Sequence, residues 1–392
     1  MYIHNMKRIY LDHTATTPLD TRVLEAMMPF FLEKFGNASS IHEFGRESRA
    51  ALDESRDSLA KVIGAKSSEL CFVSGGTEAD NLAVKGVAWE MKKAGKNHVV
   101  TSKVEHHAVL DTCRFLEECG FDISYIEVDE FGMVDPRDVA AAIGARTGLV
   151  SVMHANNEVG TINPIAEIAK IAKEKAVVFH TDAVQTFGKL PVNVTDLGVD
   201  LLSISAHKLY GPKGIGALYI RRGTRIERLI HGGGQERGRR AGTENVPLSV
   251  GFAKAAELAY EEGDSEYRRL GRLKEIFRSR LEQGFPDILF NGHPTESLPH
   301  ILNISFDSKK IDIDGEALLF NLDLAGIAVT SGSACTSGSM DPSHVLLAMG
   351  RDERTAKATV RFSMGKDTAE EDLDYTVIEL EKIVKRIGKA IG

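Results

Sequence analysis

A short apolar run ends in a histidine and a lysine at residues 201–208, which read Leu201-Leu202-Ser203-Ile204-Ser205-Ala206-His207-Lys208. Its apolar part has the length and composition of a buried strand. Gly211-Pro212-Lys213-Gly214 follows, so the strand delivers Lys208 into a glycine-containing loop. An amine at a strand end, partly removed from water, can have a lowered pKa and form a Schiff base with an aldehyde. Ser205 and His207 could hold a phosphate beside it, although a surface lysine in a turn is by far the commoner case.

Similar apolar runs alternate with helix-like segments from about residue 70 onward. We expect strands at 70–74, 98–101, 123–128, 149–153, 177–180 and 201–204, and helices at 78–94, 107–119, 136–143 and 164–174. Near-continuous apolar strands separated by helices predict an α/β fold with a mostly parallel central sheet and helices on both faces.

The pattern changes near residue 247. A long helical region at 247–283 precedes expected strands at 301–306, 327–330 and 360–363 and expected helices at 314–325 and from about 369. A chain of 392 residues is too long for one simple core. We therefore predict a large domain at 16–250 and a smaller α+β domain that combines residues 1–15 with residues 251–392.

Composition excludes several classes of function. The net charge of −8 argues against nucleic acid as the main partner, because that partner needs a concentrated basic face. No apolar stretch is long enough to span a bilayer, and residues 1–8 contain no signal-peptide hydrophobic region, so we expect a cytoplasmic protein without a membrane partner. The four cysteines form no Cys-x-x-Cys pair and should be free thiols in a reducing compartment.

Three further polar motifs follow expected strands. Ser74-Gly75-Gly76-Thr77-Glu78 links a strand to a helix, where backbone N–H groups favour an anion, although an ordinary glycine turn is the better reading of this motif alone. Asp182 could hold the ring nitrogen of a pyridine cofactor or could simply cap the next helix, and the two readings are equally favoured. His106 could stack on a planar ring and carry protons, or be a polar loop residue; a metal site is disfavoured because adjacent histidines share no ligand face.

The four motifs are expected at one edge of one sheet, because the carboxyl ends of parallel strands meet there. A phosphate cradle, a Schiff-base lysine, a ring-pairing aspartate and a ring-stacking histidine describe a single cofactor. Their coincidence at one edge favours the functional interpretation over the separate structural ones.

The smaller domain adds a thiol and a buried arginine. Cys335 lies in the small, polar, glycine-rich segment 330–339, which is typical of a mobile loop and of a reactive thiol, whereas Cys71 and Cys113 lie within apolar patterns. Arg361 interrupts the apolar run Val360-Arg361-Phe362. It could clamp a substrate carboxylate or form a structural ion pair, and the two readings are equally favoured.

Taken together, these motifs resemble the cysteine desulfurases of iron–sulfur cluster assembly (the IscS/NifS type), within the fold-type I, class V aminotransferase-like enzymes that use pyridoxal 5′-phosphate. The resemblance runs along nearly the whole chain. It includes residues 10–18, Phe35-Gly36-Asn37, Asn156-Asn157-Glu158-Val159-Gly160, Asp182-Ala183-Val184-Gln185, residues 231–238, Gly242-Thr243 and residues 331–337.

The resemblance implies a role for each matching residue. Lys208 is the Schiff-base lysine, Asp182 pairs with the pyridine nitrogen, and His106 stacks over the ring. The oxygen side of the ring contacts Gln185 and Asn157, and the phosphate is held by Gly76, Thr77, Ser205 and His207. Thr243 of a second subunit completes the phosphate site, which implies a homodimer. Asn37 and Arg361 bind the carboxylate of L-cysteine, and Cys335, in a mobile loop at about 331–342, receives the sulfur as a persulfide.

The same resemblance implies partners: an IscU-like iron–sulfur scaffold protein and other sulfur acceptors, with tRNA thiolation as a further destination. Cys335 could lend a thiolate ligand to a nascent cluster. One departure is Ala38, where the family usually has proline, so the loop that carries Asn37 should be less rigid. Rival interpretations are an aminotransferase or a selenocysteine lyase on the same fold, and a non-catalytic platform for the scaffold protein.

Overall fold

A seven-stranded sheet forms the centre of the larger half of the molecule, and its strands run in the order β2-β8-β7-β6-β5-β3-β4. The computed structural model describes residues 7–332 and 341–390. The strands are β2 (Leu70–Val73), β3 (His98–Ser102), β4 (Asp122–Ile126), β5 (Thr147–Ser151), β6 (Val178–Asp182), β7 (Leu201–Ser205) and β8 (Gly216–Ile220). Only β8 runs antiparallel to its neighbours β2 and β7, so the predicted mostly parallel sheet is confirmed.

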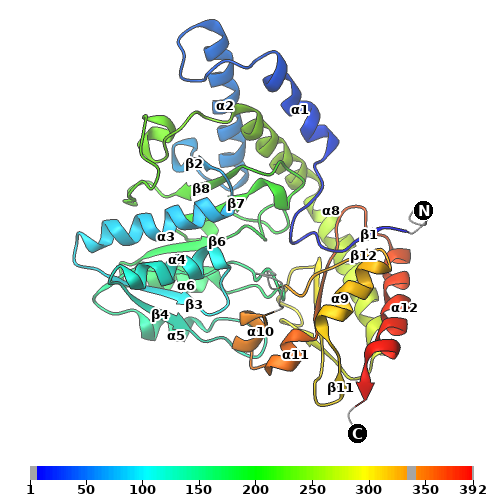
Figure 1. Ribbon diagram of the computed structural model, residues 1–392. Helices are drawn as coiled ribbons and strands as arrows, with labels where there is room; N and C mark the ends of the chain where they lie inside the picture. Colours follow the sequence, from blue (N-terminus) through cyan, green and yellow to red (C-terminus); the bar gives the residue numbers. More distant parts are fainter. Residues whose placement is uncertain (1–6, 333–340, 391–392) are drawn as a thin grey trace.

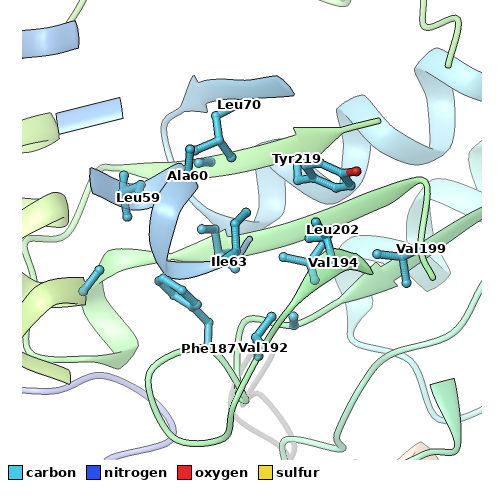
Figure 2. Close-up of a cluster of buried hydrophobic side chains, with 14 of the residues drawn as sticks. Leu59, Ala60, Ile63, Leu70, Phe187, Val192, Val194, Val199, Leu202 and Tyr219 are labelled. Atoms are coloured by element: carbon cyan, nitrogen blue, oxygen red, sulfur yellow. The ribbon is translucent and has the colours of Figure 1, made fainter. Parts of the chain in front are cut away.

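Helices cover both faces of this sheet because successive strand residues point to opposite sides. Leu201 packs with α3 (Gly76–Lys92) and α4 (His107–Glu118) on one face. Leu202, the next residue, packs on the other face with the cluster in Figure 2, which includes Leu59 and Ile63. The same alternation explains why these strands read as continuous apolar runs in the sequence.

The second face is covered mainly by helices α1 (Thr21–Leu32), α2 (Glu43–Val62), α6 (Ile165–Glu174), α7 (Val194–Leu197) and the first part of α8 (Val246–Gly284). The short helix α5 (Pro136–Ala142) contributes Val139 to the same cluster. The alternation of apolar runs and helix-like segments begins at about residue 70, so it did not predict α1 and α2. Spacings typical of a helix do occur in α2, where Leu52 and Leu59 are buried two turns apart.

A second cluster of buried side chains lies in the C-terminal part of the chain. A three-stranded antiparallel sheet there has the order β13-β10-β9, with β9 (Ile288–Asn291), β10 (Ile301–Phe306) and β13 (Thr359–Ser363). It packs with α9 (Gly315–Leu324), α12 (Glu370–Ile387) and the second part of α8. Shorter elements here are β11 (Ile311–Asp312), α10 (His344–Ala348), α11 (Glu353–Lys357) and β14 (Lys389–Ala390).

The N-terminal strand β1 (Ile9–Tyr10) packs with this second cluster, because it pairs in parallel with β12 (Ile327–Ala328). Helix α8, 39 residues long, runs from one cluster to the other, so Phe252 packs in the first and Phe277 in the second (Figure 1). A chain with two domains is expected to have two separate cores. The predicted domain boundaries, between residues 15 and 16 and between residues 250 and 251, stay a prediction. Within residues 7–332 and 341–390, no helix is long and apolar enough to cross a membrane.

A buried ion pair ties α2 to the loop before α8. The guanidinium of Arg56 binds the carboxylate of Glu236 through two hydrogen bonds of 2.6 and 2.8 Å and lies over the ring of Phe72. The backbone N–H of Phe72 donates to the same carboxylate. Glu236 and Arg237 both have positive φ, a conformation that costs free energy for residues with a side chain. This ion pair therefore holds a strained turn in place.

Replacing Arg56 with methionine should lower the free energy of unfolding by about 3–5 kcal/mol, because it leaves the Glu236 carboxylate buried without its cation. Urea unfolding followed by circular dichroism measures the loss. Arg137→Met is the matched control, since the Arg137–Asp135 pair lies on the surface and such pairs contribute less than about 1 kcal/mol. Equal losses in the two variants would contradict the assignment.

Candidate active site

A cavity of about 410 Å3 lies where the carboxyl ends of the parallel strands meet. Asp182 ends β6 and Ser205 ends β7, and two residues separate the end of β2 from the start of α3. The C-terminal part of the chain closes the other side through Thr330, Gly332 and Arg361. Ten residues singled out in the sequence line this one cavity: Gly76, Thr77, His106, Asn157, Asp182, Gln185, Ser205, His207, Lys208 and Arg361.

One end of the cavity is suited to an anion. Gly76 and Thr77 form the first turn of α3, whose leading N–H groups have no acceptor within the helix. A Cβ atom at Gly76 would lie 2.8 Å from a methyl group of Val184, so any other residue would force Val184 to shift. The hydroxyl of Ser205 is buried and has no hydrogen-bond partner. Burial, followed by the charge of Lys208, lowers the pKa of His207 to about 4, so its ring is neutral at pH 7.

Lys208 ends the short 3-10 turn η2 (Ala206–Lys208) that follows β7. Its amine donates to the carbonyl oxygens of Thr14 and Ala15 at 2.5 and 2.7 Å. Burial, and next the charge of Arg361, lowers the pKa of Lys208 to about 8. A lysine with such a pKa supplies a useful fraction of neutral amine, the form that attacks an aldehyde.

Asp182 and Gln185 lie beside the amine. The Asp182 carboxylate accepts a hydrogen bond from the Val184 N–H at 2.8 Å. A turn follows β6 there, so the alternative that Asp182 caps a helix is wrong. Burial raises the pKa of Asp182 to about 6, and a cationic partner would stabilise its ionised form. The Gln185 side chain donates to the Thr14 carbonyl, and its own amide oxygen is buried without a partner.

His106 is the N-cap of α4, where its Nδ1 accepts from the Ala108 N–H. The side chain is exposed on the cavity side. The surrounding protein still desolvates the ring, and this effect, followed by the charge of Lys208, lowers the pKa of His106 to about 4. His106 is therefore a neutral ring at the mouth of the cavity. Among the residues that the structure describes, no group of three or more His, Cys, Asp or Glu side chains is placed to hold a metal ion.

Arg361 reaches the cavity from β13. Its guanidinium pairs with Asp12 at 2.8 Å and donates to the carbonyl oxygen of Asn157 at 3.0 Å. The structural ion pair that the sequence left open therefore exists. Arg361 also lines the cavity, and its Nε is buried without a hydrogen-bond partner. The arginine thus retains a donor for a ligand.

Three expected site residues are not in the cavity lining. Asn37 is exposed, and its side chain accepts from the Ser39 N–H. The neighbouring Ala38 is buried, and its carbonyl is held by Arg49, so hydrogen bonds order this loop where a proline is usual. Thr243 lines a different cavity of about 230 Å3. Cys335 lies outside the described residues.

Asp80 is a cavity residue that the sequence motifs did not reveal. It is 1% exposed, and one of its carboxylate oxygens has no hydrogen-bond partner. Burial, followed by the nearby charge of Asp182, raises the pKa of Asp80 well above the ordinary value and so favours its protonated form. The available signal was an acidic residue on the inner face of a helix, beside the buried Ala79 and Ala83.

The cavity fits a phosphorylated pyridine aldehyde. The buried hydroxyl of Ser205 and the amide oxygen of Gln185 need partners that the described residues do not provide. The anion cradle, formed by Gly76, Thr77, Ser205 and His207, matches a phosphate. The amine of Lys208 matches an aldehyde, and the carboxylate of Asp182 matches a ring nitrogen. These features define the class of site: one built for a pyridoxal phosphate cofactor.

The comparisons with known proteins agree. The class-V aminotransferase family model matches residues 9–376, and enzymes of this family depend on pyridoxal phosphate. A cysteine desulfurase IscS of Dictyoglomus turgidum is 55% identical over 383 residues, which are 97% of this chain and 96% of that protein. The chain therefore belongs to the cysteine desulfurases of the class-V aminotransferase family.

Solved structures show the same fold. A NifS-like protein, 40% identical, superposes with a TM-score of 0.90 and covers 97% of this chain and 100% of its own. SspA in complex with cysteine, 37% identical, has a TM-score of 0.79 and covers 91% of this chain and 99% of its own. The predicted fold class, a fold-type I enzyme of the class-V type, is confirmed.

Proposed function

We propose that this protein is a cysteine desulfurase, which uses pyridoxal phosphate to take sulfur from L-cysteine and leaves L-alanine and a persulfide on Cys335. The observation that carries the proposal is one cavity that combines the Lys208 amine, an anion cradle, Asp182 and Arg361. Relatives about half identical over nearly the full chain are named cysteine desulfurase IscS, which supports the same activity.

The residues have complementary tasks in holding the cofactor. Lys208 binds the aldehyde carbon, Asp182 binds the pyridine nitrogen, and His106 stacks on the ring. Gln185 and Asn157 face the ring oxygen, and the phosphate is bound by Gly76, Thr77, Ser205 and His207. When bound, the cofactor supplies an electron sink that makes the Cα–H bond of cysteine breakable.

The chain's own groups then handle the substrate. The guanidinium of Arg361, together with Asn37, binds and orients the carboxylate of L-cysteine. The amine of Lys208, once displaced by the amino group of cysteine, takes the Cα proton at Nζ. The Cys335 thiolate attacks the substrate sulfur, and the C–S bond breaks with its electron pair left on carbon. Protonation of that carbon, with His106 as the proton carrier, yields alanine.

A homodimer is part of the proposal. Thr243 is exposed and lines the cavity next to Ser74 rather than the one that contains Lys208, so it is available to a second subunit. Glu244, beside it, is held by Arg49 of α2. Figure 1 shows α1 and α2 together at one end of the molecule. Large apolar side chains are exposed in this region, as expected of an interface: Phe31, Leu32, Phe35, Ile41 and Phe44.

Delivery of the sulfur follows from the same proposal. The acceptors are an IscU-like scaffold for iron–sulfur clusters and other sulfur-accepting proteins, including those that serve tRNA thiolation. A role of Cys335 as a shared cluster ligand stays a prediction, as does a cytoplasmic location. Mixing the protein with scaffold in the absence of L-cysteine separates cluster ligation from sulfur transfer.

Product analysis tests the activity. Holoprotein given L-cysteine and a thiol reductant should change its visible spectrum and release alanine and sulfide in equal amounts. An aminotransferase would instead produce a keto acid. A selenocysteine lyase would act on L-selenocysteine and leave L-cysteine untouched. Either of these results, or protein that stays colourless with pyridoxal phosphate, would overturn the proposal.

The rate of cofactor binding should depend on pH through Lys208. Burial lowers the pKa of this amine from its ordinary 10.5 to about 8, and only the neutral form attacks the aldehyde. The rate for apoprotein should therefore rise about tenfold per pH unit below pH 8 and level off above it. Stopped-flow absorbance with pyridoxal phosphate measures this profile. A rate that still climbs at pH 10, as for a solvated lysine, would contradict the lowered pKa.

A further inference from the structure

A second lysine lies directly behind Lys208. The Nζ of Lys189 donates to the main-chain oxygen of Lys208 at 2.6 Å. None of the ion pairs within residues 7–332 and 341–390 joins Lys189 to a carboxylate. Burial, followed by the charge of Lys208, lowers the pKa of Lys189 to about 7, so the two amines are close enough to influence each other. The proposed reaction gives Lys189 no task.

Each carbonyl oxygen of the turn that carries Lys208 has a donor. The Ala206 oxygen accepts from two backbone N–H groups farther along the loop, and the His207 oxygen accepts from Thr17. Lys189 is the donor to the Lys208 oxygen. Of these donors, it is the one whose donating group can gain or lose a charge. Tyr210, two residues later, has a φ of 63°, which costs free energy for a residue with a bulky side chain. The Lys189 hydrogen bond therefore stabilises a strained turn.

A cavity of about 50 Å3 lies on this side of the turn, and Lys208 lines both it and the cofactor cavity. The other ionisable groups around it are His13, Tyr210, Glu262, Glu266, Tyr267, His300 and Lys366. Both carboxylates already have cationic partners. Glu262 pairs with Arg22 and Lys366, and Glu266 pairs with Arg269.

The two histidines do not balance a charge on Lys189 either. Burial lowers the pKa of both His13 and His300, so their rings are neutral. The ring nitrogens of His300 are buried without hydrogen-bond partners. A positive charge on Lys189 is therefore uncompensated and directed at the Lys208 turn.

We propose that Lys189 is a positioning residue for Lys208: its ammonium group holds the main-chain oxygen of Lys208 and places a positive charge behind the amine that binds the cofactor. The inference rests on the proposed function, because it assigns Lys189 a task only if Lys208 carries the cofactor. The charge disfavours the protonated, cationic form of the cofactor-bound nitrogen of Lys208, and the hydrogen bond fixes the direction of that side chain.

Titration of the visible absorbance of the holoprotein against pH tests this role. The midpoint of the titration is the pH at which the cofactor-bound nitrogen of Lys208 is half protonated. Lys189→Met removes the charge and the donor, and should raise the pH midpoint by about 0.5 to 1 unit. Lys189→Arg keeps a positive charge at every pH and should leave the midpoint at or below the wild-type value. Equal midpoints in the wild-type protein and both variants would overturn the proposal.

Lys274→Met is the matched control. Lys274 is another buried lysine with a pKa lowered to about 8, and it donates to the Ser297 hydroxyl and the Leu298 carbonyl. Its removal should lower the melting temperature without moving the midpoint. A midpoint that moves equally in this control would show a general loss of packing and would overturn the role of Lys189. Wild-type protein without any visible absorbance would instead contradict the proposed function itself.

Discussion

Replacing Lys208 with alanine is expected to remove the visible absorbance of the cofactor-bound protein and to lower alanine formation by about a thousandfold or more. The side chain supplies both the amine that binds the cofactor and the group that takes the Cα proton, so one substitution removes two functions. The substitution also leaves the carbonyl oxygens of Thr14 and Ala15 without their donor. Absorbance spectra and amino-acid analysis after addition of L-cysteine measure the two effects.

Lys213→Ala is the control for Lys208→Ala, because Lys213 is an exposed lysine in the same loop. It should keep both the spectrum and the activity. An unchanged visible spectrum in Lys208→Ala would refute the assignment of Lys208 and, with it, the orientation of the cofactor in the cavity.

Replacing Cys335 with serine should leave cofactor binding intact and lower sulfide release by about a thousandfold or more. A serine oxygen cannot accept sulfur to form a persulfide, whereas the residues proposed to hold the cofactor do not include Cys335. The visible spectrum should therefore match that of the wild-type protein, and mass spectrometry should find no added sulfur after treatment with L-cysteine.

Cys119→Ser is the control for Cys335→Ser. Cys119 is partly exposed at the end of α4, with no role in the cavity, so this variant should keep full activity. Full sulfide release by Cys335→Ser would remove the persulfide from the mechanism and would favour a lyase that releases sulfur without a protein thiol.

Much of the cofactor site could be predicted from the sequence, because ligands of open α/β sheets bind at the carboxyl ends of the strands. Asp182 and Ser205 are the last residues of two apolar strands, and Lys208 ends the short turn that follows Ser205. The parallel arrangement of those strands brings their ends together. The family motifs then supplied a role for each residue. Asn37 and Thr243 matched the same motifs but lie outside the cavity, because a motif records residue types and not the subunit or conformation that brings them into place.

The sequence by itself determined the central sheet and predicted the edge at which the site lies and the lysine proposed for it, because alternating apolar runs and strand-end residues are local patterns. The tertiary structure decided the rest. Arg361 meets Asp12, Lys208 meets Thr14 and Lys189, and Asp80 faces the cavity from inside a helix. Most of these partners are far apart along the chain, and none shares a periodic pattern. The contacts of Asp12 and Thr14 form because the second hydrophobic core brings the N-terminal segment against the end of the sheet.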